Sequence, residues 1–313
     1  MIIRERPTGP MLFFIIKGSI LHRVLVPLTG TTLTAVVITL LHGELLHHKI
    51  TVTTIPFSLI GIALAIFLGF RNSAAYDRFW EARKLWGDFI YRSRSLARQA
   101  VSLIQGEGPA LAANGLADVR VRLVYRTVAL AHVLRHYLRE TSAVEEVRPF
   151  LSAEEWAGLQ ATGNQPDFLL HRFGDDLRQC LAEGKLDSMQ ACAMDQTLSA
   201  FAGAIAGCER IKGTPIPFAY SLLLHRTAYL YCFLLPFGLV DVLGFMTPLV
   251  VAFVAYTFFG LDAVGDEIEK PFGQGYNDLP LDAMCRTIEI NLRESIADTD
   301  IPLPLVAVDY CLN

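Results

Sequence analysis

The sequence lacks the motifs of nucleotide-dependent and hydrolytic enzymes. It contains no Walker loop, no GxGxxG turn after a strand, no GxSxG elbow and no HExxH helix. Its 6 cysteines form no CxxC pair, which indicates reduced structural thiols. A net charge of -4 gives no basic excess for binding nucleic acid. These absences make an enzyme the least favoured class, and they predict no cofactor, no metal site and no nucleic-acid partner.

The chain instead contains long apolar stretches. Its hydrophobic fraction is 52%, against about 45–50% in soluble domains. Four segments approach the ~20 residues that a helix needs to cross a bilayer. They are about Val24–Leu41, Val52–Phe70, Ile216–Phe237 and Leu239–Leu261. The last two are separated only by Gly238, which predicts a tight helical hairpin at that residue.

Basic residues flank these segments unevenly. Four precede the first segment and seven follow the second, within Arg71–Arg98, whereas the loop between them holds only Lys49. The positive-inside rule therefore predicts that both termini and about residues 71–213 lie in the cytoplasm. The expected parts are two N-terminal transmembrane helices, a helical cytoplasmic region, two further transmembrane helices and a cytoplasmic C-terminal segment, over residues 1–70, 71–213, 214–262 and 263–313.

The cytoplasmic region has the pattern of helices. Helices are expected over about 71–105, 116–140 and 167–183, with Gly184 ending the last of these. Ser152 and Glu155 form a capping box, and Asp187 begins a further helix that reaches about 212. No alternating strand pattern is present, so the fold class is all-α.

Two sets of polar residues near the membrane segments carry open alternatives. The loop after the first segment holds Glu44 with three histidines, which favour a solvated interface over a metal site because no ligand geometry is fixed: His42, His47 and His48. The third segment holds His225 and Arg226. A cation in a span is a functional candidate by default, and an ion pair with Asp241 or Asp262 is the structural alternative.

Residues 58–87, SLIGIALAIFLGFRNSAAYDRFWEARKLWG, change from apolar to charged without a proline. On a helix, five apolar residues fall in a stripe about 80° wide: Ile55, Leu59, Ile62, Ile66 and Phe70. Small residues flank it: Ala63, Ala65 and Gly69. The stripe either packs against the chain's own spans or meets its copies around an axis and lines a pore. Spacing alone favours the first alternative.

Beyond Phe70 the same face becomes polar. It carries Ser73, Asp77 and, at its margin, Glu81. Such a change suits a helix that leaves the bilayer and forms the wall of a water-filled vestibule.

Three blocks of the chain resemble the prokaryotic bestrophins. They are RNSAAYDRFWEARKLWG from Arg71, CERIKGTPIPFAY from Cys208 and FFGLDAVGDEIEKPFG from Phe258. The resemblance covers nearly the whole chain. It implies a homopentameric channel of the bacterial inner membrane, with four transmembrane helices per subunit and one axial pore. Its partners would be its own copies, the lipid bilayer and permeating monovalent ions.

The resemblance also implies positions along the pore. The second transmembrane helix forms an apolar neck, whose rings would be Ile62, Ile66 and Phe70. A second narrowing near the cytoplasmic exit falls on the helix over 167–183, with Cys180 as the candidate. Together with this pore architecture, the apolar stripe favours a lining role over packing within one subunit.

Three functions remain open. Monovalent cations such as sodium and potassium are favoured, because the bacterial branch is associated with cation conduction and a ring of Asp77 would attract cations. The alternative is a chloride channel like the animal members. An alternative of another class is a membrane scaffold or sensor that does not conduct.

One departure from the family concerns calcium. Animal members carry a dense acidic run after the equivalent PFG, and it binds activating calcium. Here Gln274, Gly275 and Tyr276 replace the first acids, which leaves Asp278 and Asp282 scattered. Calcium needs six to eight oxygen ligands, so the sequence predicts that this site is lost.

Overall fold

A computed structural model describes the chain except residues 5–8, 10–14, 16, 42–43, 46–47 and 50–52. The regular elements among the described residues are helices, apart from two isolated bridges and a short hairpin of β1 (Glu44–Leu45) and β2 (His48–Lys49). They divide into two compact units. We call Arg4–Phe79 with Pro215–Pro271 the apolar unit. Met1–Ile3, Trp80–Thr214 and Phe272–Asn313 form the polar unit.

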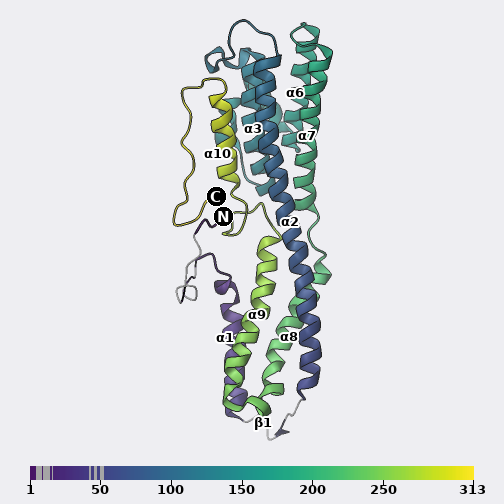
Figure 1. The fold of residues 1–313 in the computed structure, drawn as a ribbon, viewed down its shortest axis with the longest axis vertical. Coiled ribbons are helices and arrows are strands. Elements are labelled where there is room, and N and C mark those ends of the chain that lie inside the picture. Colours follow the sequence, from purple (N-terminus) through teal and green to yellow (C-terminus); the bar gives the residue numbers. More distant parts are fainter. Residues whose placement is uncertain (5–8, 10–14, 16, 42–43, 46–47, 50–52) are drawn as a thin grey trace. The chain divides into compact units, whose positions relative to one another are not determined.

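The apolar unit consists of α1 (Leu21–Leu40), the first part of α2 (Thr54–Leu103), α8 (Phe218–Leu243) and α9 (Thr247–Ile268) (Figure 1). Helix α9 packs against both α1 and α8. A buried cluster of Val24, Cys232, Ala255 and Phe259 joins these three helices. Three stretches are long and apolar enough to cross a membrane: Leu21–Leu40, Thr54–Leu103 and Phe218–Ile268.

The hairpin between the last two apolar helices lies later than the sequence predicts. Gly238 is inside α8, and the chain turns at the short 3-10 helix η4 (Gly244–Met246). A Cβ on Gly238 would lie 2.5 Å from Phe57 Cε2, so this glycine permits close helix packing. Gly244 has a φ of 52°, which ordinary residues rarely adopt. The prediction of a turn at Gly238 is therefore wrong.

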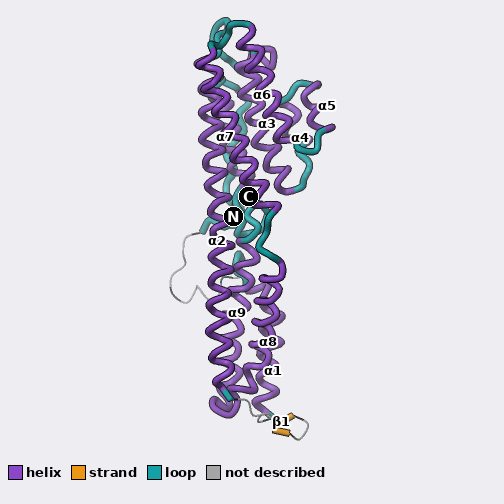
Figure 2. The backbone as a smooth tube through the Cα atoms, turned by 90° about the vertical axis from the view of Figure 1, so that its right-hand side faces the viewer, coloured by secondary structure: helices purple, strands orange, loops and turns teal. Residues whose placement is uncertain are grey.

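The polar unit is a helical bundle built around α3 (Val119–Arg139), which packs against α6 (Gln165–Ala182) and α10 (Leu281–Glu294). Helix α7 (Ser188–Gly213) lies along α6, as Figure 2 shows. Shorter elements complete the unit: η2 (Ala112–Ala117), α4 (Val144–Val147), η3 (Arg148–Phe150) and α5 (Ala153–Ala161). The ring of Phe89 on α2 meets Phe201 on α7 with centroids 4.9 Å apart.

Local sequence signals place several helix ends. The capping box of Ser152 and Glu155 is confirmed at α5, and Asp187 caps α7 with Gln190 as its reciprocal partner. Gly184 follows α6 with a φ of 71°, as expected for a residue that ends a helix. The stretch over 54–103 is a single helix, because no proline interrupts it after the first turn.

Candidate functional site

Helix α2 has a covered face and an uncovered face within the apolar unit. Leu64 and Leu68 are 2% and 0% exposed and pack against Leu224 and Ala228 of α8. The stripe residues on the other face are largely exposed. Ile55 is 68%, Leu59 66%, Ile62 62%, Ile66 52% and Phe70 64% exposed. The other described helices of this chain therefore leave the stripe uncovered. This disfavours the alternative in which the stripe packs against the chain's own spans.

The stripe continues along α2 as a row of exposed polar residues. Asp77 is exposed and has no ion pair with any described residue. Steps of three and four residues lead from it to Trp80 and Lys84, and two further steps of seven residues lead to Tyr91 and Arg98; all four residues are exposed.

Three cations on or beside this row have no ion pair among the described residues: Lys84, Arg94 and Arg98. The neighbouring acids are engaged, since Glu81 pairs with Arg210 and Asp88 lies 3.3 Å from Arg92. The polar face expected from the sequence ended at Glu81, so these three cations were not predicted. The same helical spacing, extended by five turns, identifies them.

Arg71 directly follows the stripe and is a buried cation of the apolar unit. It is 1% exposed, and its Nη1 donates to Asp262 Oδ1 at 2.7 Å and to the Asp262 carbonyl at 3.2 Å. Its Nη2 donates to Asp266, and Glu269 Oε2 lies 3.8 Å away. This set, which we call the Arg71 cluster, ties α2 to α9 next to Phe70.

His225 and Arg226 of α8 differ in their partners. His225 Nδ1 lies 2.6 Å from Asp262 Oδ2, so Asp262 is shared between His225 and Arg71. Arg226 is exposed and makes no ion pair with the described residues. The structural alternative, an ion pair with Asp241 or Asp262, is therefore met at His225 and not at Arg226 among the described residues. The arginine that binds Asp262 is Arg71. In the sequence it is the first residue after the second apolar segment.

Cys180 lies on the inner face of α6 and is 1% exposed. Burial raises the pKa of its thiol. Its side chain does not reach the surface of the subunit. The expectation that Cys180 forms a second narrowing of the pore therefore does not fit its burial. The exposed apolar residue at this end of α6 is Leu181, which is 45% exposed. No motif anchors this helix in the sequence, and one residue on a helix changes the face by about 100°.

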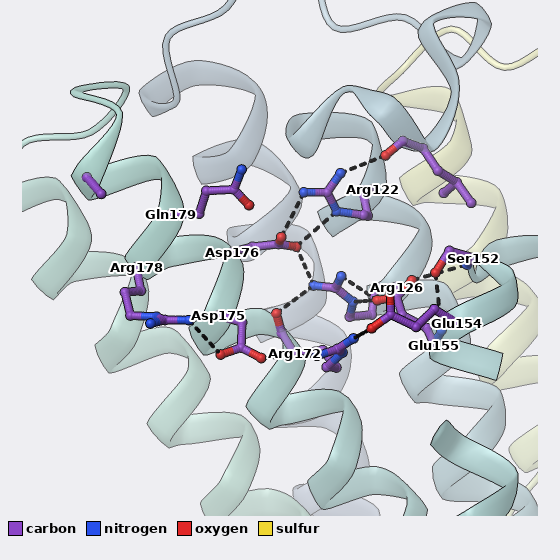
Figure 3. A pocket seen from close by; sticks show the side chains of 12 residues that line it. Arg122, Arg126, Ser152, Glu154, Glu155, Arg172, Asp175, Asp176, Arg178 and Gln179 are labelled. Atoms are coloured by element: carbon purple, nitrogen blue, oxygen red, sulfur yellow. Dashed lines mark hydrogen bonds and ion pairs between the residues drawn. The ribbon is translucent and has the colours of Figure 1, made fainter. Parts of the chain in front are cut away.

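A polar cavity of about 610 Å³ opens between α3, α5 and α6 (Figure 3). Arg126 lies at its base and donates to Glu155 at 2.8 Å and to Asp176 at 2.6 Å. Arg122 binds the same Asp176 at 2.7 Å. Burial opposes ionisation of Asp176, but Arg122 and Arg126 outweigh it and lower its pKa. These charges satisfy one another, so they hold three helices together and leave none free for a ligand.

The two acids that remain in the segment of the expected calcium site, Asp278 and Asp282, are engaged within the polar unit. Asp278 accepts a hydrogen bond from the Gly275 amide at 2.6 Å. Asp282 is bound by Arg135 and Arg139, each at 2.8 Å. No group of His, Cys, Asp or Glu suited to a metal is found among the described residues. In the loop between α1 and α2, His42, His47 and the side chain of His48 lie outside what the structure describes.

Comparison with known proteins shows the family to which the chain belongs. The family model of bacterial and fungal bestrophins matches residues 1–294. A voltage-dependent anion channel-forming protein of Mesorhizobium japonicum is 42% identical over 95% of this chain and 93% of its own length. A protein of the same description from Escherichia coli is 37% identical over 98% of this chain and 97% of its own.

Solved structures agree with the sequence comparison. A bacterial bestrophin homologue from Klebsiella pneumoniae superposes with a TM-score of 0.80 and 40% identity, covering 87% of this chain and 98% of that one. The resemblance carried by the three sequence blocks is confirmed. The chain belongs to the bacterial and fungal bestrophin family.

Proposed function

We propose that the protein is a passive ion channel whose apolar neck is formed by Ile62, Ile66 and Phe70 of several copies. The observation that carries this proposal is the exposed stripe on α2, which the other described helices leave uncovered, whereas Leu64 and Leu68 of the same helix are buried. One stripe cannot enclose a pore, so copies must meet around an axis. The proposed assembly is a homopentamer in the inner membrane, with α1, the first part of α2, α8 and α9 crossing the bilayer and both termini cytoplasmic.

We infer that the channel favours anions. The relatives described above are named as anion channel-forming proteins, which supports the chloride alternative over the cation expectation. The charges on α2 point the same way. Asp77 is the negative side chain without an ion pair on this face, whereas Lys84, Arg94 and Arg98 are positive. Repeated around an axis, this positive excess would enrich anions in the vestibule.

Reversal potentials of the protein in liposomes with asymmetric potassium chloride test this inference. The expected sign is that of a chloride-permeable pore, and a potassium-selective potential would restore the cation reading. Lys84→Glu is expected to shift the chloride-to-potassium permeability ratio several-fold toward potassium. Arg148→Glu is the matched control, because Arg148 is exposed, has no ion pair among the described residues and lies off α2. Pentamers that pass no ion under any condition would favour the scaffold or sensor.

Assembly is tested at Gly69, which is exposed beside the stripe. A Cβ added there meets no atom of the same chain within 4 Å, so a larger side chain fits the isolated copy. In the assembly it would occupy space that a neighbouring helix needs. Gly69→Leu is expected to lower the pentamer fraction several-fold in native mass spectrometry.

Gly30→Leu is the control for this experiment. Gly30 is also exposed and open, but it lies on α1. Equal assembly of the two variants would contradict the placement of Gly69 at an interface.

Currents are expected to be insensitive to micromolar cytosolic calcium. Asp282 is neutralised by two arginines, and the Asp278 carboxylate closes a local turn. Neither is free to contribute to the six to eight oxygens that calcium requires. Planar-bilayer recordings with and without calcium chelator measure this. A steep rise in open probability with calcium that Asp278→Ala abolishes would overturn the prediction.

A further inference from the structure

Helix α8 has an uncovered face within the apolar unit, and an arginine lies in the middle of it. Leu224 and Ala228 pack against α2, and Cys232 belongs to the buried cluster shared with α1 and α9. The other side of the helix is open in the single copy. Four exposed residues follow one another there in steps of three or four: Leu223, Arg226, Leu230 and Phe233. A single charge therefore lies on an otherwise apolar surface.

Arg226 needs a counter-charge that its own chain does not supply. It makes no ion pair with any residue that the structure describes. A guanidinium stays protonated in proteins, so it cannot become neutral to suit an apolar environment. An unpaired charge in the hydrocarbon layer is costly, and arginines in membrane helices pair with other groups or reach toward the interface. An anionic group is therefore expected beside Arg226 in the membrane.

The depth of Arg226 follows from that of His225, which precedes it. His225 Nδ1 lies 2.6 Å from Asp262, which also accepts a hydrogen bond from Arg71 at 2.7 Å. Arg71 is the first charged residue after the apolar part of α2, so in the proposed topology this cluster marks the cytoplasmic edge of the hydrocarbon layer. Helical side chains tilt toward the helix N-terminus, and α8 begins on the cytoplasmic side. The Arg226 guanidinium therefore extends toward the headgroups of the cytoplasmic leaflet.

A neighbouring copy offers no free acid at this depth among the side chains that the structure describes. Three of the acids there belong to the Arg71 cluster, and Glu267 lies 3.1 Å from Arg23. The other two described acidic side chains of the apolar unit lie at different depths. Asp77 follows the cluster by about 9 Å along α2, and Asp241 follows Arg226 by about 22 Å along α8. A protein carboxylate is therefore a poor candidate for the counter-charge.

We propose that Arg226 binds the phosphate of a phospholipid in the cytoplasmic leaflet, with an acyl chain of the lipid along Leu230 and Phe233. A phosphate accepts two parallel hydrogen bonds from a guanidinium, which makes it a well-matched partner. Leu230 and Phe233 are 60% and 51% exposed and follow Arg226 toward the bilayer centre, the direction in which acyl chains extend. The inference rests on the proposed crossing of the bilayer by α8, but not on conduction or on the number of copies.

Native mass spectrometry of the full chain in detergent, with lipid added, measures the binding. The probe is dioleoylphosphatidylglycerol, whose only charge is its phosphate. Dioleoylglycerol has the same acyl chains without the phosphate, and glycerol phosphate has the phosphate without the chains. The chain is expected to retain the phospholipid several-fold more than dioleoylglycerol and to retain no glycerol phosphate. Equal retention of the two lipids would overturn the proposal, and so would retention of glycerol phosphate, because the ligand would then be a free phosphate.

Two substitutions assign the phosphate to Arg226. Arg226→Met is expected to abolish the preference for the phospholipid over dioleoylglycerol, whereas Arg226→Lys, which keeps the charge, retains most of it. Arg148→Met is the matched control, because Arg148 is an exposed arginine of the polar unit without an ion pair among the described residues. A preference that survives Arg226→Met, or that Arg148→Met lowers equally, contradicts the assignment.

Photo-cross-linking in nanodiscs distinguishes a lipid from a neighbouring copy on this face. A benzophenone amino acid replaces Leu230, and the expected main product is one chain joined to one phospholipid. The same probe at Met189, an exposed apolar residue of the polar unit, sets the background. A main product of two joined chains would show that protein covers this face and would overturn the proposal.

Extraction of membranes with alkaline carbonate tests the crossing of the bilayer separately. The chain is expected to stay with the membrane. A chain that carbonate removes would refute both the crossing and the lipid site. A chain that stays in the membrane but shows no preference for the phospholipid would refute the lipid site alone.

Discussion

Ile66→Ala is expected to raise ion flux through reconstituted pentamers several-fold, with little change in which ion passes. Ile66 is the middle residue of the proposed neck and is 52% exposed in the single copy. A narrow apolar constriction resists wetting, and an ion that enters it loses hydration without gaining a polar partner. Shortening each side chain of the ring widens the passage and lowers this desolvation cost. Single-channel conductance in planar bilayers measures the change.

Phe70→Ala is expected to act in the same direction, because its ring is 64% exposed at the end of the same stripe. Leu68→Ala is the matched control, since Leu68 is 0% exposed and packs against α8. A cavity at such a site costs about 2–5 kcal/mol of stability in soluble cores but leaves the pore wall intact. The neck assignment fails if Ile66→Ala and Phe70→Ala assemble normally and conduct like the wild type, or if Leu68→Ala matches their effect.

The sequence predicted features that depend on periodicity and local capping. A spacing of three or four residues marked the exposed stripe from Ile55 to Phe70 before any fold was known. Ser152 and Asp187 marked helix starts, because a cap needs only a side chain within hydrogen-bond reach of the first turn. Such signals involve neighbours along the chain and are therefore readable from sequence.

Features that depend on distant partners were not predictable in this way. Gly238 looks like a turn residue in the sequence. In the fold, the ring of Phe57 on α2 occupies the space that a side chain at Gly238 would need. Cys180 lies one residue from the exposed face of α6, and only packing against α3 and α7 decides which side is buried. Asp262 was one of two alternative partners for His225 and Arg226, but it binds His225 and also Arg71, which lies 191 residues away along the chain.

Whether α2 favours cations or anions depends on which of its charged residues are considered. Asp77 alone suggests cations, but Lys84 and Arg98 lie on the same face further along the helix. In the proposed channel, an acid next to the neck and bases deeper in the vestibule would act in opposite directions on ion selectivity. The unpaired bases outnumber the acid, which is why the anion reading has the stronger physical basis.

Arg71→Met is expected to destabilise the apolar unit by about 3–5 kcal/mol, the usual cost of removing one partner from a buried ion pair. Arg71 is 1% exposed and Asp262 is 4% exposed. Without the guanidinium, the Asp262 carboxylate keeps only His225 as a side-chain partner among the described residues. Because Arg71 follows Phe70 directly, the neck should also lose its fixed orientation. Unfolding in detergent, followed by circular dichroism against denaturant, measures the loss of stability.

Arg226→Met is the matched control, because it makes the same change in the same unit at an exposed arginine without an ion pair among the described residues. Its effect should stay within about 0.5 kcal/mol, as for most surface substitutions. The double variant Arg71→Met with Asp262→Asn removes both charges, so it should cost less than the sum of the two single variants. If Arg71→Met costs no more than Arg226→Met, or if the two single effects simply add, the Arg71 cluster does not hold α2 against α9.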